Sequence, residues 1–163
     1  METPEIRGIK VEPLTAEAFR PFGTVLEIPS GKPDNFSDVF AMWQDLADIG
    51  VLGEKASIVY LVNKRRAFVL DIMERHKNGI EVFFPVKGQS ILAVAPPSKD
   101  LPKPEDIRCF YIDGTKPYII NKDVWHWSTF PLGDEAGFFL IFKKGLPRED
   151  VEEQKMNPIP ILL

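Results

Sequence analysis

Two short stretches decide the fold of this 163-residue chain: Glu74-Arg75-His76-Lys77-Asn78-Gly79-Ile80-Glu81 and Asp123-Val124-Trp125-His126. They hold both histidines of the chain. Residues at i and i+2 of a strand share a face, so Glu74 and His76 are expected to point the same way. A hairpin can bring Glu81 opposite them, and a later strand can add His126. The pattern therefore predicts two imidazoles and two carboxylates inside a small β-barrel, a set that can bind a divalent metal or exchange protons.

From Ser57 onward the sequence is typical of β-structure, with Gly, Pro, Asn and Asp between segments rich in β-branched and aromatic residues. The expected strands are 57–62, 67–75, 81–84, 89–94, 108–112, 118–120 and 138–142. Seven or more short strands without intervening long helices favour a closed, mainly antiparallel β-barrel or jelly roll with small peripheral helices. Lys87-Gly88 is expected to be a tight hairpin turn that places the strand carrying Glu81 beside its partner.

The two ends of the chain add smaller elements. Thr15 can cap a short helix that Pro21 ends. The other expectations are an extended segment at 10–13, a strand at 24–28, a polar loop at 29–38, a helical turn or long connection at 42–50, a C-terminal helix at 147–155, and an apolar tail at 157–163 that packs on this subunit or a neighbour.

The composition bounds the class of protein. A chain of this length forms one domain, and its 44% hydrophobic and 27% charged residues are ordinary for a soluble protein. A net charge of −4 and a pI near 5.3 argue against a nucleic-acid partner. The basic Lys64-Arg65-Arg66 cluster is interpreted as a solvated turn. Cys109 is the only cysteine, which excludes an intramolecular disulfide, and its place in an expected strand indicates a small buried hydrophobe.

No targeting or membrane segment is expected. The start, Met1-Glu2-Thr3-Pro4-Glu5, lacks a basic region followed by an apolar run. The longest apolar run, 137–142, is too short to cross a bilayer. We therefore expect a cytoplasmic protein.

The spacing of the ionisable residues resembles that of the cupin superfamily. The first cupin motif has a ligand pair at i and i+2, a Glu five residues after the second ligand, and a Gly seven residues after that Glu. Here Glu74 and His76 form the pair, and Glu81 and Gly88 follow. His126 is the candidate for the histidine of the second motif. Glu74 stands where cupins usually have His.

A narrower family matches more of the chain. Glu-Arg-His (74–76), Phe-Pro-Val-Lys-Gly (84–88), Val-Trp-His (124–126) and the opening at 13–23 resemble the bacterial ureidoglycolate lyases, also called ureidoglycolate hydrolases. The likeness runs from about residue 9 to residue 142 in preserved order. It implies a homodimeric enzyme that splits (S)-ureidoglycolate into glyoxylate and urea, a step in the use of purine nitrogen through allantoin.

This reaction needs a base, an acid and a cation for a small anionic substrate. His126, Glu81 and His76 are the candidates for the acid–base work. Glu74, His76, Glu81 and His126 are the candidate ligands of a divalent metal, with nickel, manganese, iron and zinc all compatible. Without a metal, Glu81 would be a buried carboxyl with a raised pKa. The candidates for substrate binding are Lys87, Arg75 and Trp125, although strand parity points Arg75 away from the histidines.

Two departures from the lyase pattern keep an alternative open. Glu81 stands where that family is expected to have Gln, and Trp127 stands where a second His is common. Both move the pattern towards the general cupin ligand set. The alternative is a metal-dependent cupin isomerase or oxygenase that acts on a small hydroxy or keto acid. A third reading is a non-enzymatic sensor of a small acid or a metal.

Overall fold

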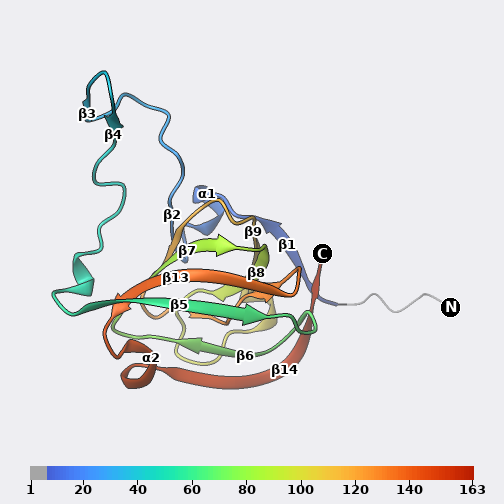
Figure 1. Cartoon of the computed structure of the whole chain (residues 1–163). Helices are drawn as coiled ribbons and strands as arrows, with labels where there is room; N and C mark the ends of the chain where they lie inside the picture. Colours follow the sequence, from blue (N-terminus) through green and yellow to red (C-terminus); the bar gives the residue numbers. More distant parts are fainter. Residues whose placement is uncertain (1–6) are drawn as a thin grey trace.

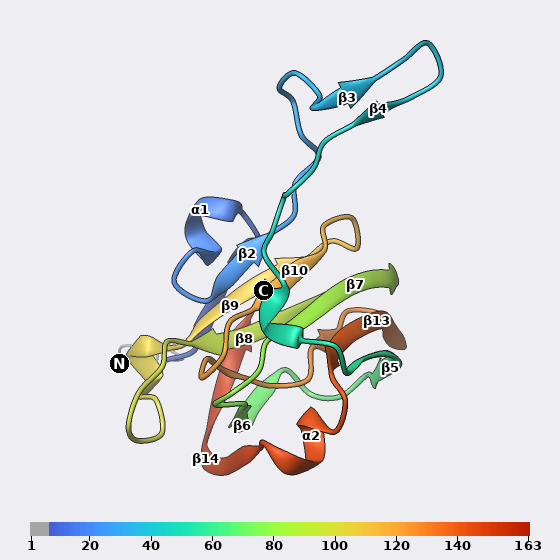
Figure 2. The same cartoon turned by 90° about the vertical axis from the view of Figure 1, so that its left-hand side faces the viewer.

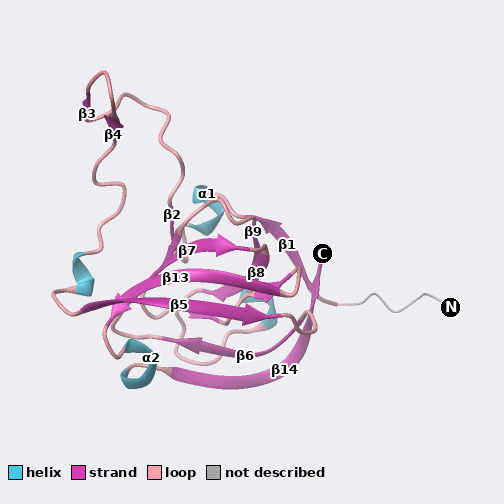
Figure 3. Cartoon of the chain, in the orientation of Figure 1, coloured by secondary structure: helices cyan, strands magenta, loops and turns pink. Residues whose placement is uncertain are grey.

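Strands are the main regular secondary structure of the chain, and they build a barrel from two sheets that face each other (Figures 1 and 3). The computed structural model describes residues 7–163. The strands are β1 (Ile9–Pro13), β2 (Gly23–Val25), β3 (Asn35–Phe36), β4 (Ala41–Met42), β5 (Ala56–Lys64), β6 (Val69–Arg75), β7 (Glu81–Lys87), β8 (Ser90–Ala95), β9 (Arg108–Ile112), β10 (Tyr118–Ile120), β11 (Trp125–His126), β12 (Phe130–Pro131), β13 (Glu135–Lys143) and β14 (Glu152–Leu162). The helices are short: α1 (Ala16–Phe19), α2 (Leu146–Glu149), and 3₁₀ turns at Gly50–Leu52 and Pro104–Asp106.

The sheet order explains how the barrel closes. One sheet has the order β11-β6-β14-β1-β9-β8-β12, and β11 also pairs with β8. The other has the order β2-β10-β7-β13-β5. Most pairs are antiparallel, while β1 runs parallel to both β14 and β9. The expected all-β, mainly antiparallel barrel with small peripheral helices is therefore confirmed.

Aromatic side chains from both sheets meet in the barrel interior. Phe19, Phe110, Tyr118 and Phe138 are at most 1% exposed and belong to one core cluster. The ring of Phe19 contacts those of Phe110 and Tyr118 edge-on, with centroids 5.3 and 6.0 Å apart. Thr15 accepts a hydrogen bond from the backbone N–H of Ala18, so the expected cap of the first helix is confirmed. Burying whole aromatic side chains is a large part of the stability of a domain of this size.

The expected hairpin at Lys87-Gly88 is wrong. Lys87 ends β7 in the five-stranded sheet, where it lies opposite Gly137, whereas β8 belongs to the seven-stranded sheet. The turn therefore carries the chain from one sheet to the other. Gly88 has φ +73°, and a Cβ on it would lie 2.5 Å from the carbonyl oxygen of Glu135, so the position requires glycine.

The expected C-terminal helix at 147–155 is also wrong. Only α2 is helical, and the chain then forms the long strand β14. β14 pairs antiparallel with β6, and its end pairs parallel with β1. Ile161 is 5% exposed and packs with Leu70 and Met73. The apolar tail therefore packs on its own subunit.

Residues 28–49 leave the barrel altogether. Figures 1 and 2 show this segment, which carries β3 and β4, standing away from the body as a long arm. It contains the expected polar loop, and the undecided stretch 42–50 proves to be mostly a connection that returns to the barrel. We call residues 28–49 the arm.

Two other expectations concern what the chain lacks. Cys109 is buried, and burial, together with the nearby charge of Glu12, raises the pKa of its thiol to about 12, as expected for a packing residue rather than a nucleophile. Among residues 7–163, no helix has the length and apolar character needed to span a bilayer. The first residues, on which the absence of a signal peptide was argued, lie outside the described part of the chain.

Candidate active site

Three strands position the ionisable cluster, and they come from both sheets. β6 ends with Glu74 and Arg75, and His126 of β11 lies directly opposite Glu74 in the ladder. Glu81 begins β7 in the facing sheet, where it lies opposite Ile120. His76 follows β6 by one residue. The structure therefore brings all four residues to one place between the sheets.

The four side chains are in close contact. His76 Nε2 lies 2.9 Å from Glu81 Oε1, and His126 Nε2 lies 3.0 Å from the same oxygen. Glu74 Oε1 is 4.0 Å from His76 Nε2 and 3.8 Å from His126 Nε2. The two imidazole centroids are 5.3 Å apart. Both histidines and Glu81 are buried, whereas the side chain of Glu74 is 24% exposed.

Backbone carbonyls orient both imidazoles. His76 Nδ1 lies 2.6 Å from the carbonyl oxygen of Asp150, and His126 Nδ1 lies 2.9 Å from that of Val124. A carbonyl oxygen only accepts, so each Nδ1 must carry a proton and donate. Each Nε2 is then a lone pair in the neutral ring and an N–H only in the imidazolium. Both Nε2 atoms thus point towards Glu81, where each can bind either a proton or a metal ion.

Mutual charge interactions shift the pKa values of this cluster. Burial alone would lower the pKa of His76, but the close contact and charge of Glu81, the carbonyl of Asp150 and the charge of Glu74 raise it to about 9. Burial also opposes the charged form of His126, and Glu81 again outweighs it, so this pKa is raised. Without a metal, His76 is therefore protonated at neutral pH, and Glu81 favours the protonated form of His126.

The pKa values of the two carboxyls differ from those expected from the sequence. Burial would raise the pKa of Glu81, but the two imidazoles lower it to about 2. The interpretation of metal-free Glu81 as a carboxyl with a raised pKa is thus wrong, because two cations contact it. The raised pKa belongs to Glu74, where burial outweighs the attraction of the more distant imidazoles. Of the two carboxyls, Glu74 is therefore the one that binds a proton more readily.

A small cavity of about 40 Å³ gives access to the cluster. Glu74, Glu81 and His126 line it, together with Phe83 and Trp127, which flank the two motifs in the sequence. The remaining wall residues were missed by sequence reasoning: Leu61, Asn63, Leu92, Ser128, Thr129 and Leu140. Asn63 Nδ2 donates to Thr129 Oγ1 at 2.8 Å, and both residues are buried. The alternation of β5 could have indicated that Asn63 faces inward, but nothing local to the sequence pairs it with Thr129.

Arg66 holds one wall of this cavity in place. Its guanidinium donates to the carbonyls of Ser128 at 2.5 Å and Thr129 at 2.8 Å, and it lies 4.0 Å from the ring centroid of Phe130. Partial burial lowers the pKa of Arg66, and the charge of Asp71 partly offsets this effect. The interpretation of this basic cluster as a solvated turn is therefore wrong for Arg66, which binds a loop distant in sequence.

The structure does not bring Lys87 to the cavity. Glu81 and Lys87 are the two ends of β7, which at about 3.3 Å per residue lie about 20 Å apart. The ammonium of Lys87 instead pairs with Glu135 at the surface. The substrate-binding role expected for Lys87 is corrected on this ground.

Arg75 and Trp125 lie on the other side of their strands. The guanidinium of Arg75 donates to Glu152 Oε2 at 2.9 Å and to the carbonyl of Ser98, and it lies 4.3 Å from the ring centroid of Trp125. The indole N–H of Trp125 donates to Ser98 Oγ at 3.0 Å. Strand alternation turns both side chains away from Glu74 and His126. The structure therefore does not bring either side chain to the cavity, and it is the neighbouring Trp127 that lines it.

The donor set fits a divalent cation. Donor atoms of Glu74, His76 and His126 all lie within 4.8 Å of one another. Glu81 Oε1 and His126 Nε2 are buried and, despite their separation of 3.0 Å, neither makes a well-aligned hydrogen bond within residues 7–163. Buried polar atoms without such partners are costly unless something else satisfies them. Imidazole and carboxylate donors suit manganese, iron, nickel or zinc.

Comparison with known proteins places this site in a family. The family model described as ureidoglycolate lyase matches residues 6–162. The ureidoglycolate lyase of Burkholderia mallei is 31% identical over 159 residues, covering 93% of this chain and 91% of that protein. That of Azotobacter vinelandii is 28% identical over 151 residues, covering 86% and 87%.

Solved structures give weaker similarities. RmlC from Streptococcus suis, in complex with dTDP-D-xylose, superposes with a TM-score of 0.44 at 10% identity, covering 59% of this chain and 47% of that one. The oxalate decarboxylase of Lactobacillus farciminis gives a TM-score of 0.44 at 15% identity, covering 62% and 27%. The family assignment rests on the sequence matches, which span nearly the whole chain. The chain belongs to the ureidoglycolate lyase family.

Proposed function

We propose that this protein is a ureidoglycolate lyase, a carbon–nitrogen lyase that splits ureidoglycolate into glyoxylate and urea in purine degradation through allantoin. The observation that carries the proposal is the convergence of Glu74, His76, Glu81 and His126 on one cavity, in a chain of the ureidoglycolate lyase family. A cytoplasmic location belongs to the same proposal.

The substrate carries a hydroxyl, a carboxylate and a urea nitrogen on one carbon. Cleavage requires loss of the hydroxyl proton, breaking of the C–N bond, and delivery of a proton to the departing nitrogen. The hydroxyl oxygen becomes the aldehyde oxygen of glyoxylate, and the C–N electron pair leaves with the urea nitrogen. A base and an acid on opposite sides of the bond are therefore the minimum that the site must supply.

The cavity contains a suitable pair. Glu74 has a raised pKa and a partly exposed side chain, so its carboxylate can take the hydroxyl proton. The imidazolium of His126 can give its Nε2 proton to the leaving nitrogen. Glu74 Oε1 and His126 Nε2 are 3.8 Å apart, a distance that one water or the product can bridge to return the proton. Glu81 keeps His126 protonated between turnovers.

The walls of the cavity supply the remaining contacts. Thr129 and Ser128 offer hydroxyls and Asn63 an amide to the carboxylate or ureido group, in place of the charged side chains that lie elsewhere. Phe83, Leu92 and Trp127 limit the access of water. The cavity holds little more than one water, so substrate binding must widen it.

Glu74, His76 and His126 would hold a divalent metal, and Glu81 lies against both imidazoles. Such a metal supplies Lewis acidity that lowers the pKa of a bound hydroxyl. The metal and the two imidazole protons compete for the same Nε2 atoms. The metal content of the purified protein therefore decides which form of the site is active.

Glyoxylate release from ureidoglycolate tests the function. We expect turnover by the wild-type protein and a loss in kcat/KM of roughly 100-fold or more in His126→Ala. Lys87→Ala is the matched control, because this exposed residue lies far from the cavity. Elemental analysis and a chelator titration separate the two forms, since loss of activity with chelator requires a metal. Full activity in His126→Ala would contradict both the metal-dependent and the metal-free form of the proposed site.

The same assay excludes the alternatives. An oxygenase would consume dioxygen with a small hydroxy or keto acid, and a sensor would bind such an acid without turnover. Absence of glyoxylate release together with either result would replace the lyase proposal.

A further inference from the structure

The arm is an ordered ladder rather than a loose loop. Asn35 of β3 lies opposite Met42 of β4, and Phe36 lies opposite Ala41. The indole N–H of Trp43 donates to the carbonyl of Gly31 at 3.0 Å, which ties the two sides of the arm together. A two-stranded ribbon of this kind is marginally stable by itself in water. Something outside the ribbon must therefore stabilise it.

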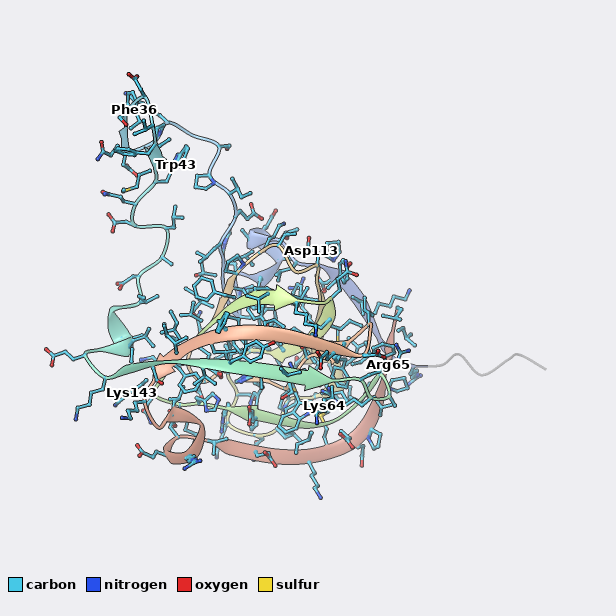
Figure 4. The ribbon with its side chains drawn as sticks, in the orientation of Figure 1. Phe36, Trp43, Lys64, Arg65, Asp113 and Lys143 are labelled. Carbon is cyan, nitrogen blue, oxygen red and sulfur yellow. The ribbon has the colours of Figure 1, made fainter. Side chains whose placement is uncertain are left out.

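The arm exposes apolar side chains without cover from its own subunit. Ile28 is 94% exposed, Val39 90%, Phe36 62% and Leu46 52%. Figure 4 shows Phe36 and Trp43 on the arm, well away from the barrel. Exposed apolar residues are common singly, but several of them on one projecting segment indicate a surface that binds another protein.

The arm is also acidic. Residues 28–49 contain four aspartates, Asp34, Asp38, Asp45 and Asp48, and a single cation, Lys32, which gives a net charge of −3. Within residues 7–163, none of these five side chains forms an ion pair. The surface that binds the arm should therefore be apolar and basic.

The barrel carries one such surface at the start of β5. A cleft of about 720 Å³ has an apolar floor that includes Val59 and Phe142. The charged residues that line it are Lys55, Lys143, Lys144, Arg148 and Glu149, with a net charge of +3. None of the four cations is in an ion pair within the described residues. The backbone N–H of Lys144 donates to the carbonyl of Lys55 at 2.7 Å, which fixes the two sides of the cleft relative to each other. We call this the basic cleft.

We propose that two copies of this chain exchange arms, with the arm of each copy bound in the basic cleft of the other. The charges of the arm and the basic cleft are equal and opposite, and both surfaces combine apolar with charged side chains. Figures 1 and 4 show the arm extended away from the end of the barrel where Lys143 lies, so the arm does not fill its own cleft. In a dimer with two-fold symmetry, the contact between arm and basic cleft forms twice, once for each arm. This arrangement specifies how the expected homodimer forms.

Arm exchange would also cover the barrel beside the catalytic cavity. The importance of this contact for catalysis rests on the proposed function. Val59 of the basic cleft lies on the same face of β5 as Leu61 and Asn63, which line the cavity. At the other side of the cleft, Arg148 and Glu149 directly precede Asp150, whose carbonyl orients His76. An arm bound in the cleft therefore covers the end of the barrel next to the site of its partner.

A charge-swap experiment tests the exchange without relying on activity. One variant carries Asp38→Lys and Asp45→Asn, since Asn tolerates the positive φ of Asp45. A second carries Lys143→Glu and Lys144→Glu. The control matched to the second variant is Lys10→Glu with Lys103→Glu, which makes the same change in net charge on exposed residues away from the cleft. Masses are measured by light scattering and sedimentation, and circular dichroism confirms folding.

We expect the wild-type protein to have twice the chain mass of 18.5 kDa at micromolar concentration. Each cleft or arm variant should raise the dimer dissociation constant by roughly tenfold or more, and the control by less than about threefold. An equimolar mixture of the two variants should restore a large part of the dimer, because one contact of each mixed dimer joins a wild-type arm to a wild-type cleft, while the other joins a neutral arm to a cleft of charge −1.

Three results would overturn the proposal. They are a monomeric wild-type protein, a dimer that neither charge reversal weakens, and weakened variants that fail to rescue each other. If the dimers behave as expected but glyoxylate release is absent, arm exchange stands and the proposed function fails.

Discussion

Replacing Glu81 with Gln in metal-free protein isolates the interaction that organises the candidate site. Gln keeps the size of the side chain and removes the charge that two imidazoles share. In the wild-type protein, Glu81 is the main cause of the raised pKa of His76, about 9 against an ordinary value of 6.5. That difference corresponds to about 3 kcal/mol of folding free energy, of which about 2 kcal/mol is assigned to Glu81 because the carbonyl of Asp150 and the charge of Glu74 supply the rest. The lowered pKa of Glu81 describes the same pair, so the two contributions are not added.

The sign of the pH dependence follows from linkage. The folded state holds the proton of His76 more tightly than the unfolded state does, so this stability is fully present below about pH 6.5 and is lost as the pH rises through 9. The opposite holds for Glu81, whose contribution is present above about pH 4.5 and is lost as the pH falls through 2. Without a metal, the pair therefore contributes most between about pH 4.5 and 6.5.

Urea unfolding with a chelator present, at pH values from 5.5 to 9.5, measures this effect. Between pH 6 and 9.5 the wild-type protein should lose about 2 kcal/mol more than Glu81→Gln does. Glu105→Gln serves as the control, because it removes an exposed carboxylate and should retain the wild-type pH dependence. Parallel curves for the wild-type protein and Glu81→Gln would refute the ion-pair reasoning.

Three further substitutions test other parts of the structure. Arg66→Lys keeps the charge but not the fork that binds the carbonyls of Ser128 and Thr129, so kcat/KM should fall roughly tenfold with little loss of stability; an unchanged rate would remove this positioning role. Arg75→Ala should lower the free energy of unfolding by about 2–4 kcal/mol in urea titrations, since it removes a buried guanidinium that binds Glu152 and the carbonyl of Ser98; stability within about 0.5 kcal/mol of wild type would contradict this. His76→Ala should abolish most binding of added zinc or manganese in equilibrium dialysis, because the remaining donors leave the coordination shell open, and unchanged binding would exclude His76 as a ligand.

Local patterns in the sequence predicted the strands that carry the site. Alternation placed Glu74 and His76 on one side of the chain at the end of β6 and turned Arg75 away, because side chains of extended backbone alternate regardless of what surrounds it. The number of short strands and the absence of long helices indicated the barrel. The contacts that complete the cavity were beyond such reasoning. Arg66 and Asn63 each bind residues more than sixty positions away, and no periodicity within either segment records that pairing.

The C-terminal segment shows how tertiary pairing overrides local preference. Residues 147–155 are charged and lack obvious strand residues, so they suggested a helix, yet from Glu152 onward they extend along β6. Strand preference depends largely on what the neighbouring strand offers. Here Glu153 lies opposite Glu74 in the ladder, and its charge adds to the raised pKa of that carboxyl. The missed strand is therefore part of the electrostatics of the site as well as of the fold.

The position of Glu81 was anticipated for a reason that the structure does not support. The expected hairpin at Lys87-Gly88 would have paired β7 with β8 in one sheet, whereas the turn joins the two sheets. Glu81 still meets the histidines, because β7 faces β6 and β11 across the barrel and begins at their level. The course of β7 across the barrel also places Lys87 far from the cavity. A straight strand of seven residues that starts at the site must end far from it, so one β7 strand cannot supply both a ligand and a substrate-binding cation to a small cavity.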